Sequence, residues 1–240
     1  MRVKSVISYD GSKFYGFQCQ KSTDNTVTAT IYRALQKLGI SSKVVGSGRT
    51  DRGVHATGQV IHFDLPPFWS DLEKLHTMLN RHLHPAIHVR RILPVDENFH
   101  ARYSAKRRAY RYILTKRTFS PFLAPYVTFF DYNEELISHA IKLFEGTHDF
   151  QFFMKTGSDV KTSVRTIYKA TTYTYGDFFV LYFEANGFLR AQVRMMVEFL
   201  LQISQDNFTI YHLKEQLEGQ ARYLTTLAPP NGLYLTRVIY

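Results

Sequence analysis

The sequence has little of what crosslinks a chain or anchors it in a membrane. Cys19 is the single cysteine among 240 residues, which excludes an internal disulfide and a cysteine-based metal cluster. No long apolar run is present, and residues 1–6 lack the apolar core of a signal peptide. Recognisable internal repeats and low-complexity segments are also missing. These absences predict a soluble cytoplasmic protein without membrane association.

Acidic residues are scarce in the first half of the chain. Residues 1–120 carry 20 Lys and Arg against 8 Asp and Glu, a net charge of +12, whereas residues 121–240 carry 10 against 12, a net charge of −2. Each neutralised phosphate releases counterions and so adds to binding, and a localised basic surface therefore favours a phosphate-rich polymer over a small acid. A basic surface kept only for solubility is the alternative.

Apolar periodicity predicts alternating strands and helices, and the 45% of apolar residues can form a full core. In the first half we expect strands at 3–9, 43–45, 58–63 and 87–95, with helices at 27–38 and 72–83. In the second half we expect strands at 106–114, 164–175, 178–184 and 233–240, with helices at 136–144 and 188–203. Residues 117–130, rich in Phe and Pro, are expected to cross between the halves. This order predicts an α+β protein with domains 1–104 and 105–240.

The most informative motif is the run 46–56, G-S-G-R-T-D-R-G-V-H-A. A single carboxylate, Asp51, stands among three glycines and between Arg49 and Arg52. Glycines let the backbone approach a ligand closely, and neighbouring arginines favour the ionised form of a carboxylate. The pattern alone leaves an ordinary surface loop and a catalytic loop equally open.

Residues 48–56 and several further motifs resemble the TruA family of tRNA pseudouridine synthases. The other matching runs are 9–12, 16–20, 99–106, 110–112, 144–150, 164–167, 187–189, 193–195 and 228–235. They occur in order and cover nearly the whole chain, which makes the resemblance specific. The chain departs from the family at Phe17, where tryptophan is commoner, at Arg190, where tyrosine or histidine is common, and at Glu198, where glycine is usual.

The resemblance implies an isomerase, an intramolecular transferase that converts uridine to pseudouridine at positions 38, 39 and 40 of the tRNA anticodon stem-loop. It implies no cofactor and no metal, and a homodimer as the working form. It also implies that the two halves are RRM-like or ferredoxin-like and are joined around a central mixed, mostly antiparallel sheet, with the active-site cleft between them.

The family motifs also imply roles for individual residues. Asp51 is the implied catalytic aspartate, which attacks the sugar C1′ or otherwise drives cleavage of the N-glycosidic bond. Tyr110 stacks on the target base and is a candidate to remove the C5 proton, and Arg194 pairs with the catalytic carboxylate. Leu189 walls the uracil pocket, and Arg49 contacts the substrate. The basic residues expected to contact the RNA are Arg52, Lys106, Arg107 and Arg108.

Without the resemblance, simpler interpretations of three of these residues hold. Tyr110 is then a core aromatic of a strand, and Leu189 is a core residue. Arg194 is four residues from both Arg190 and Glu198, the spacing of an exposed ion-pair ladder on one helical face.

Two other functions fit parts of the sequence. A non-catalytic RNA-binding protein explains the basic half and its aromatic residues but gives no reason for Asp51 among arginines. A metal-dependent nucleic-acid hydrolase needs paired carboxylates, which no motif supplies. The spacing of His76, His82, His84 and His88 fits no closed set of metal ligands, and RNA contact or plain surface explains them better.

Overall fold

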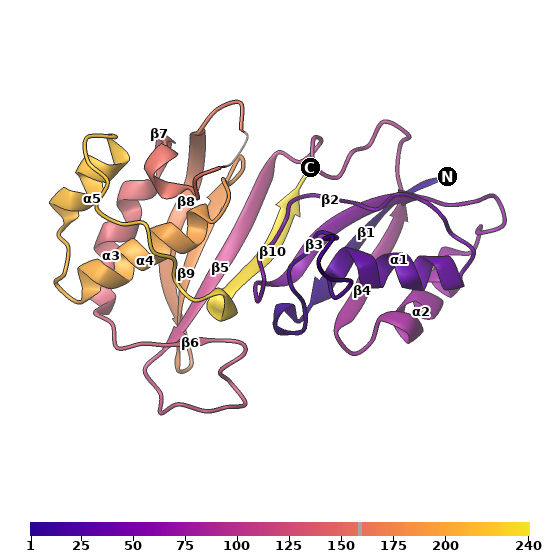
Figure 1. Cartoon of the computed structure of the whole chain (residues 1–240), viewed down its shortest axis with the longest axis horizontal. Helices are drawn as coiled ribbons and strands as arrows, with labels where there is room; N and C mark the ends of the chain where they lie inside the picture. Colours follow the sequence, from indigo (N-terminus) through magenta and orange to yellow (C-terminus); the bar gives the residue numbers. More distant parts are fainter. Residues whose placement is uncertain (158–159) are drawn as a thin grey trace. The chain divides into compact units, whose positions relative to one another are not determined.

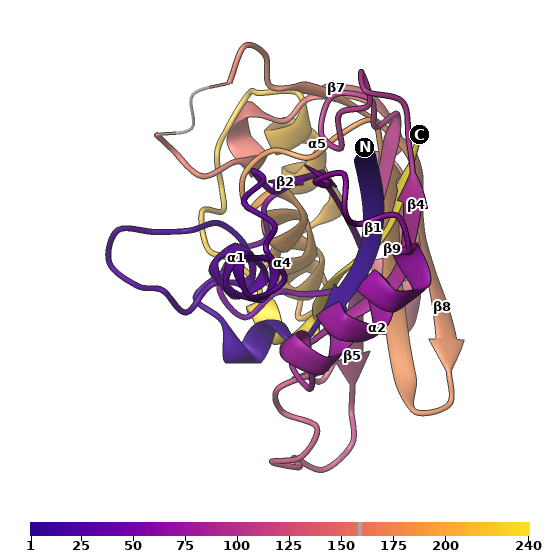
Figure 2. The ribbon, with the colours of Figure 1, turned by 90° about the vertical axis from the view of Figure 1, so that its right-hand side faces the viewer.

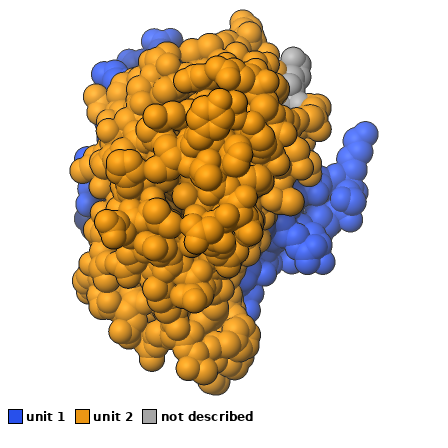
Figure 3. Space-filling view, turned by 90° about the vertical axis from the view of Figure 1, so that its left-hand side faces the viewer, with its two compact units in different colours: residues 1–106, 234–240 blue, residues 107–233 orange. Residues whose placement is uncertain are grey.

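The computed structural model describes residues 1–157 and 160–240 and divides into two compact units. Unit 1 comprises residues 1–106 and 234–240, and unit 2 comprises residues 107–233 (Figure 3). The division expected from the sequence, at 104/105, leaves the last strand with the second half, whereas the structure pairs it within unit 1. The predicted domains themselves stay a prediction, since a compact unit need not fold alone.

Unit 1 is built on a mixed sheet whose strands lie in the order β4-β1-β3-β10. The strands are β1 (Arg2–Tyr9), β2 (Val45–Gly46), β3 (His55–Asp64), β4 (Ile87–Pro94) and β10 (Leu233–Ile239). β1 pairs antiparallel with β3 and β4, β2 pairs antiparallel with β3, and β10 pairs parallel with β3. Every second residue of β1, from Val3 to Tyr9, is buried, as its alternation predicts.

Two amphipathic helices of unit 1, α1 (Val27–Lys37) and α2 (Leu72–Leu83), contact each other and cover one face of this sheet (Figures 1 and 2). Side-chain caps set their starts: Thr26 accepts from the Ala29 N–H, and Asp71 accepts from the Lys74 N–H. Both helices lie where the apolar spacing predicts them.

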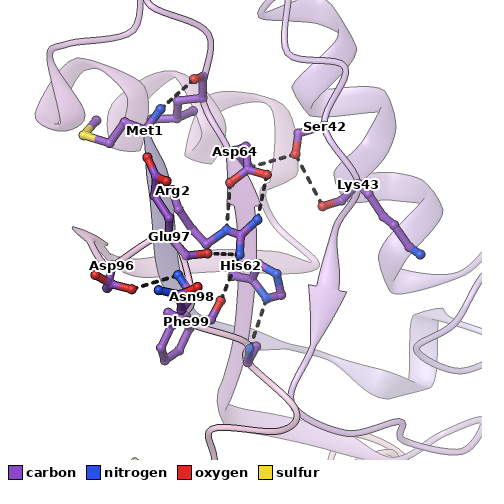
Figure 4. A network of polar contacts seen from close by, with 12 residues as sticks. Met1, Arg2, Ser42, Lys43, His62, Asp64, Asp96, Glu97, Asn98 and Phe99 are labelled. Carbon is purple, nitrogen blue, oxygen red and sulfur yellow. Dashed lines mark hydrogen bonds and ion pairs between the residues drawn. The ribbon is translucent and has the colours of Figure 1, made fainter.

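A polar network ties the segment 96–101 to the sheet of unit 1 (Figure 4). Arg2 donates to both oxygens of Asp64, at 2.8 and 3.1 Å, and to the carbonyl of Phe99 at 3.3 Å. The Nδ1 atom of the buried His62 accepts from the Ala101 N–H at 3.1 Å. Burial, followed by the nearby His100 and Arg2, lowers the pKa of His62 to about 4, so this ring is neutral at pH 7.

In unit 2 the strands lie in the order β5-β9-β8-β7, with the short β6 parallel to β5. The strands are β5 (Arg107–Thr115), β6 (Thr128–Phe129), β7 (Gly146–Asp149), β8 (Val164–Tyr175) and β9 (Phe178–Ala185). Apart from β6, the pairings are antiparallel, and β8 and β9 form the expected hairpin around residues 176–177. The α-helices are α3 (Glu134–Ala140), α4 (Gln192–Ser204) and α5 (Ile210–Leu217).

Aromatic rings fill the core of unit 2. Phe144, Phe153, Phe183 and Phe199 are all fully buried. Phe144 meets Phe153 edge-on at a centroid distance of 5.5 Å, and Phe153 lies 6.0 Å from Phe199. Such pairs contribute about 0.5–1.5 kcal/mol each beyond the area they bury. α3 and α4 contact each other over this core (Figure 1).

The structure corrects the two helices expected in unit 2, at 136–144 and 188–203, and adds a third. The helix expected at 188–203 begins only at Gln192, because Ala191 has a left-handed backbone (φ 62°) that a helix does not contain. Residues 141–144 form a 3-10 helix after α3. α5 was not expected; it is short and starts at a capping box of Thr209 and His212, which lacks the usual Glu or Gln.

The α+β class is confirmed, with mixed pairing in both units. Across the described ranges 1–157 and 160–240, none of the helices combines the length and apolarity needed to cross a bilayer.

Candidate functional site

The loop that carries Asp51 is anchored to β3 on one side. The Ser47 N–H donates to the Val60 carbonyl at 2.8 Å, and the Ser47 hydroxyl donates to the Gln59 side-chain oxygen at 2.6 Å. The Gln59 amide nitrogen in turn donates to the Gly48 carbonyl at 2.9 Å. Gln59 is fully buried, so these bonds stabilise the loop in a site that excludes water.

A second set of contacts anchors the loop to the segment after β1. The Phe17 N–H donates to the Thr50 carbonyl at 3.0 Å, and the Thr50 hydroxyl is bonded to the buried Tyr9 hydroxyl at 2.8 Å. Behind Asp51 the chain turns, with the Val54 N–H donating to the Asp51 carbonyl at 3.2 Å and Gly53 at φ +79°. These contacts fix the backbone of the loop on both sides of Asp51.

At two glycines the neighbouring atoms leave little room for a side chain. A Cβ on Gly11 would lie 2.0 Å from the Val54 carbonyl oxygen, and a Cβ on Gly46 would lie 2.5 Å from the Phe17 ring. The first contact is to backbone, which cannot swing aside. Gly11, after β1, and Gly46, in β2, are thus needed for the shape of the aspartate loop.

His55 is a further motif residue to which the sequence assigns no role. It is buried, stacks on Tyr234 at a centroid distance of 4.7 Å, and its Nδ1 accepts from the Gly11 N–H at 3.0 Å. The same Nδ1 atom lies 3.4 Å from a carboxylate oxygen of Asp10. His55 therefore joins the loop to β10. Its position inside the 46–56 motif was the one sign in the sequence that it matters for the site.

Within the motif, Asp51 is half-buried, whereas Arg49 and Arg52 are exposed. The Arg52 guanidinium carbon lies 4.3 Å from the centroid of the Tyr15 ring. The predicted pairing of Asp51 with arginine stays a prediction.

In unit 2, Tyr110 and Tyr112 share one face of β5, since residues two apart along a strand point the same way. Both are buried. Tyr110 meets Phe188 edge-on, with ring centroids 5.2 Å apart. The Tyr112 hydroxyl donates to the Pro229 carbonyl at 2.9 Å and is also bonded to Thr128. Sequence reasoning identified Tyr110 and missed Tyr112.

Tyr112 is electrostatically linked to α4. Burial raises the pKa of its hydroxyl well above the ordinary value, the bond with Thr128 and the charge of Arg194 oppose this, and Glu198 adds to it. Tyr112 is therefore a neutral hydrogen-bond donor that holds the chain at Pro229.

Leu189 and Arg194 lie at the entry to α4. The Leu189 N–H donates to the Gln192 side chain at 2.8 Å, and the Gln192 N–H donates back to the Leu189 carbonyl at 3.2 Å. The Arg194 Nε donates to the Ala228 carbonyl at 2.7 Å, and the Ala228 N–H donates to the Arg194 carbonyl at 3.2 Å. The segment at Ala228 thus fixes the direction of Arg194.

The ion-pair ladder considered for α4 cannot include Arg190 on the helical face of Arg194. Arg190 precedes the helix, because α4 begins at Gln192, and so it cannot share a helical face with Arg194. The Glu198 carboxylate accepts from Gln202 at 2.9 Å.

The three basic residues at the start of β5 and just before it differ in their contacts. Arg107 forms an ion pair with Glu184 at 2.9 Å and lies 4.4 Å from the ring centroid of Tyr168. The Arg108 Nη1 donates to the Asn186 carbonyl at 3.2 Å. By strand alternation, Arg108 is on the face of Tyr110 and Arg107 on the opposite face. Lys106 is exposed.

The structure thus places the predicted site residues in two groups. Unit 1 holds Arg49, Asp51, Arg52 and Lys106, and unit 2 holds Arg107, Arg108, Tyr110, Leu189 and Arg194. The first group offers a carboxylate on a rigid loop beside cationic side chains. The second offers an aromatic and apolar wall with a directed guanidinium. Such groups suit chemistry on an anionic substrate that carries a flat ring.

Comparison with known proteins gives a consistent result over the whole chain. A family model described as tRNA pseudouridine synthase matches residues 6–104 and 140–240. Proteins named tRNA pseudouridine synthase A are similar to this chain: 44% identical in Helicobacter hepaticus (99% of this chain, 98% of that protein) and 43% in Wolinella succinogenes (98% and 93%). The Campylobacter jejuni RM1221 protein is 39% identical, with both chains fully covered.

A solved structure, a Cbf5-Nop10-Gar1 complex, matches with a TM-score of 0.36 and 17% identity over 97% of this chain and 48% of that one. A likeness this weak carries no argument.

Proposed function

This chain belongs to the tRNA pseudouridine synthase A family, and on that premise we propose that it isomerises uridine to pseudouridine at positions 38, 39 and 40 of the tRNA anticodon stem-loop. In this reaction the N1–C1′ bond breaks and a C5–C1′ bond forms, while the proton on C5 is lost and N1 gains one. The observation that carries the proposal is the hydrogen-bonded, glycine-dependent loop that carries Asp51 between Arg49 and Arg52 in the sequence.

Asp51 is the catalytic group of this proposal. Its carboxylate acts at the sugar C1′, either as a nucleophile or by driving cleavage of the glycosidic bond. A loop anchored by hydrogen bonds on both sides keeps the carboxylate in one position, which lowers the entropic cost of reaching the reactive geometry. The detached uracil must then turn before it is rejoined.

We propose that the predicted site residues of unit 2 act on the target uracil. In this proposal Tyr110, whose ring packs edge-on against Phe188, stacks on the uracil and is the candidate to remove the C5 proton, and the buried Leu189 walls the pocket. Arg194 is the positively charged partner of the catalytic carboxylate, and its guanidinium is oriented by the hydrogen bond to the Ala228 carbonyl. These roles come from the family motifs and agree with the burial of each residue.

The RNA is read by shape. An enzyme that modifies three neighbouring positions cannot depend on one base sequence, so contacts to the backbone must dominate. The excess of positive charge in residues 1–120 supplies such contacts. We propose a homodimer as the active form.

The proposal is tested by incubating the purified protein with unmodified tRNA transcripts that carry uridine at 38, 39 or 40, and mapping pseudouridine. We expect modification at these positions by the natural chain and none by Asp51→Asn. A chelator should leave the rate unchanged, which separates the isomerase from a metal-dependent hydrolase. No pseudouridine at these positions, or modification only of other uridines in the transcripts, would contradict the proposal.

A further inference from the structure

Next to Asp51, one large aromatic side chain points outward rather than into the core. Tyr15 is 46% exposed, while its neighbours Phe14 and Phe17 are 6% and 5% exposed. Its backbone is held on both sides: the Tyr15 N–H donates to the Asn25 carbonyl at 2.9 Å, and Gln20 donates to the Tyr15 carbonyl at 2.7 Å. The fold therefore fixes the backbone from which the Tyr15 ring projects.

The segment of Tyr15 is docked on the aspartate loop itself. Gly16 has φ +112°, and a Cβ there would lie 3.2 Å from the Thr50 carbonyl oxygen, so no larger residue fits without strain. The Phe17 N–H donates to that same carbonyl at 3.0 Å. Asp51 is thus one residue from this hydrogen bond and Tyr15 is two residues from it.

Arg52 completes the arrangement. Its guanidinium carbon is 4.3 Å from the Tyr15 ring centroid, a distance at which the charge lies against the ring. Arg107, over Tyr168 at 4.4 Å, is also paired with Glu184, whereas Arg52 has no ion pair within the residues that the structure describes. Arg52 therefore presents a full positive charge on an aromatic surface.

We propose that Tyr15 and Arg52 form a nucleotide-binding platform, on which an unpaired base flanking the target uridine stacks while Arg52 contacts its phosphate. Single-stranded RNA bases stack on aromatic rings and on guanidinium planes, and loops are where such bases are available. The platform rests on the proposed function, and it adds a specificity residue, Tyr15, to the cationic Arg52. Its role is to hold the RNA beside Asp51, not to take part in bond breaking.

The test compares substitutions at Tyr15 for binding and turnover on an unmodified anticodon stem-loop. Tyr15→Phe keeps the ring and should bind as the natural chain does. Tyr15→Leu keeps an apolar side chain without a π-face and should weaken binding about tenfold, as loss of one stacked base does, with kcat changed less than twofold. Tyr15→Ala should match Tyr15→Leu. The matched control is Tyr173→Ala, which removes an exposed tyrosine that lies 5.9 Å from Arg111 in unit 2 and should bind normally.

A second experiment changes the RNA instead of the protein. Abasic substitution of each nucleotide next to the target should reveal one position at which the natural chain and Tyr15→Leu bind equally, because the stacked base is already gone. Arg52→Ala should also reduce the dependence of log affinity on log salt by about one phosphate contact. The double variant Tyr15→Leu/Arg52→Ala should lose less than the two single losses combined, since each residue supports the other.

Each outcome has one consequence. Normal binding by Tyr15→Leu, or a penalty that persists at every abasic position, would overturn the platform. The thermal unfolding midpoints of Tyr15→Phe and Tyr15→Leu are compared with that of the natural chain. A lower midpoint identifies a folding defect separately from a loss of binding. If the natural chain forms no pseudouridine in any tRNA, the proposed function fails; if it forms pseudouridine and Tyr15→Leu binds normally, only the platform fails.

Discussion

The aspartate loop of unit 1 and the Tyr110 region of unit 2 are constructed in different ways. The loop takes its chemical groups from one short run, residues 46–56, and its shape from backbone hydrogen bonds and glycines. The unit 2 region gathers β5, the turn before α4 and the segment at 228–229, which are far apart in the chain. A contiguous motif shows its chemistry in the sequence, whereas a dispersed one shows it only when the chain is folded.

The largest expected effect on turnover comes from replacing the carboxylate of the loop, Asp51. Asp51→Asn should abolish turnover, by more than about a thousandfold, because loss of a nucleophilic or charge-stabilising carboxylate costs several kcal/mol. Affinity for tRNA should stay within a few-fold, since the basic surface is unchanged. Single-turnover pseudouridine formation and a filter-binding titration measure the two quantities. Turnover above about one tenth of the natural rate would remove Asp51 from the mechanism.

The corresponding test in unit 2 is Arg194→Ala. We expect about a hundredfold loss of turnover, because the directed guanidinium is gone, and partial recovery with Arg194→Lys, which keeps the charge but lacks the planar fork. The rate is measured over pH 6 to 9. An unchanged rate and pH profile for the alanine variant would leave Arg194 as a helix-to-loop tie through Ala228.

A backbone substitution separates the shape of the loop from its chemistry. Gly11→Ala should lower stability by about 2–3 kcal/mol and turnover about tenfold or more, because the new Cβ meets the Val54 carbonyl at 2.0 Å. Gly187→Ala is the control, since its Cβ would lie 3.8 Å from the nearest atom, an ordinary contact. Urea unfolding of both variants is the measurement, and equal stabilities would show that the loop accommodates the methyl group.

Acid should weaken unit 1 through His62. Its folded pKa, about 4, is below the ordinary value of 6.5, so the unfolded chain binds the proton more readily and stability is lost as pH falls from 6.5 toward 4. Between pH 7 and 5 this is worth up to about 2 kcal/mol. His62→Gln, whose amide oxygen can accept from the Ala101 N–H, should show less of this loss in urea titrations at the two pH values. Parallel pH dependences would exclude His62 as the cause.

The smallest expected effects are on tRNA affinity, and they distinguish basic residues that are neighbours in the chain. The sequence predicts that charge reversal of Arg52, Lys106, Arg107 or Arg108 weakens binding to all tRNAs by similar factors. Strand alternation sharpens this: Arg108→Glu, on the face of Tyr110, should weaken binding about tenfold, and Arg107→Glu, on the opposite face, about twofold. Salt-dependent binding of several tRNAs compares them, and equal losses would show that the face of β5 is irrelevant to RNA contact.

Several features were open to prediction because they depend on neighbours in the chain. The alternation of β1, the spacing of α1 and α2, and the hairpin of β8 and β9 follow local periodicity, and the structure has them where expected. The start of α4 was misplaced, because a left-handed residue at Ala191 is set by the packing of the turn and not by apolar spacing. The same error produced the ladder that included Arg190.

What the sequence by itself determined was the α+β class, the asymmetric charge and the aspartate motif, since composition, periodicity and a contiguous run need no partner elsewhere in the chain. Only the tertiary structure decided that β10 pairs within unit 1, that Tyr112 and Ala228 brace the region of Arg194, and that Tyr15 lies against Arg52. Each of these joins residues distant in the sequence. Such contacts form because folding buries apolar surface and must satisfy the polar groups that are buried with it, a condition set by the whole fold.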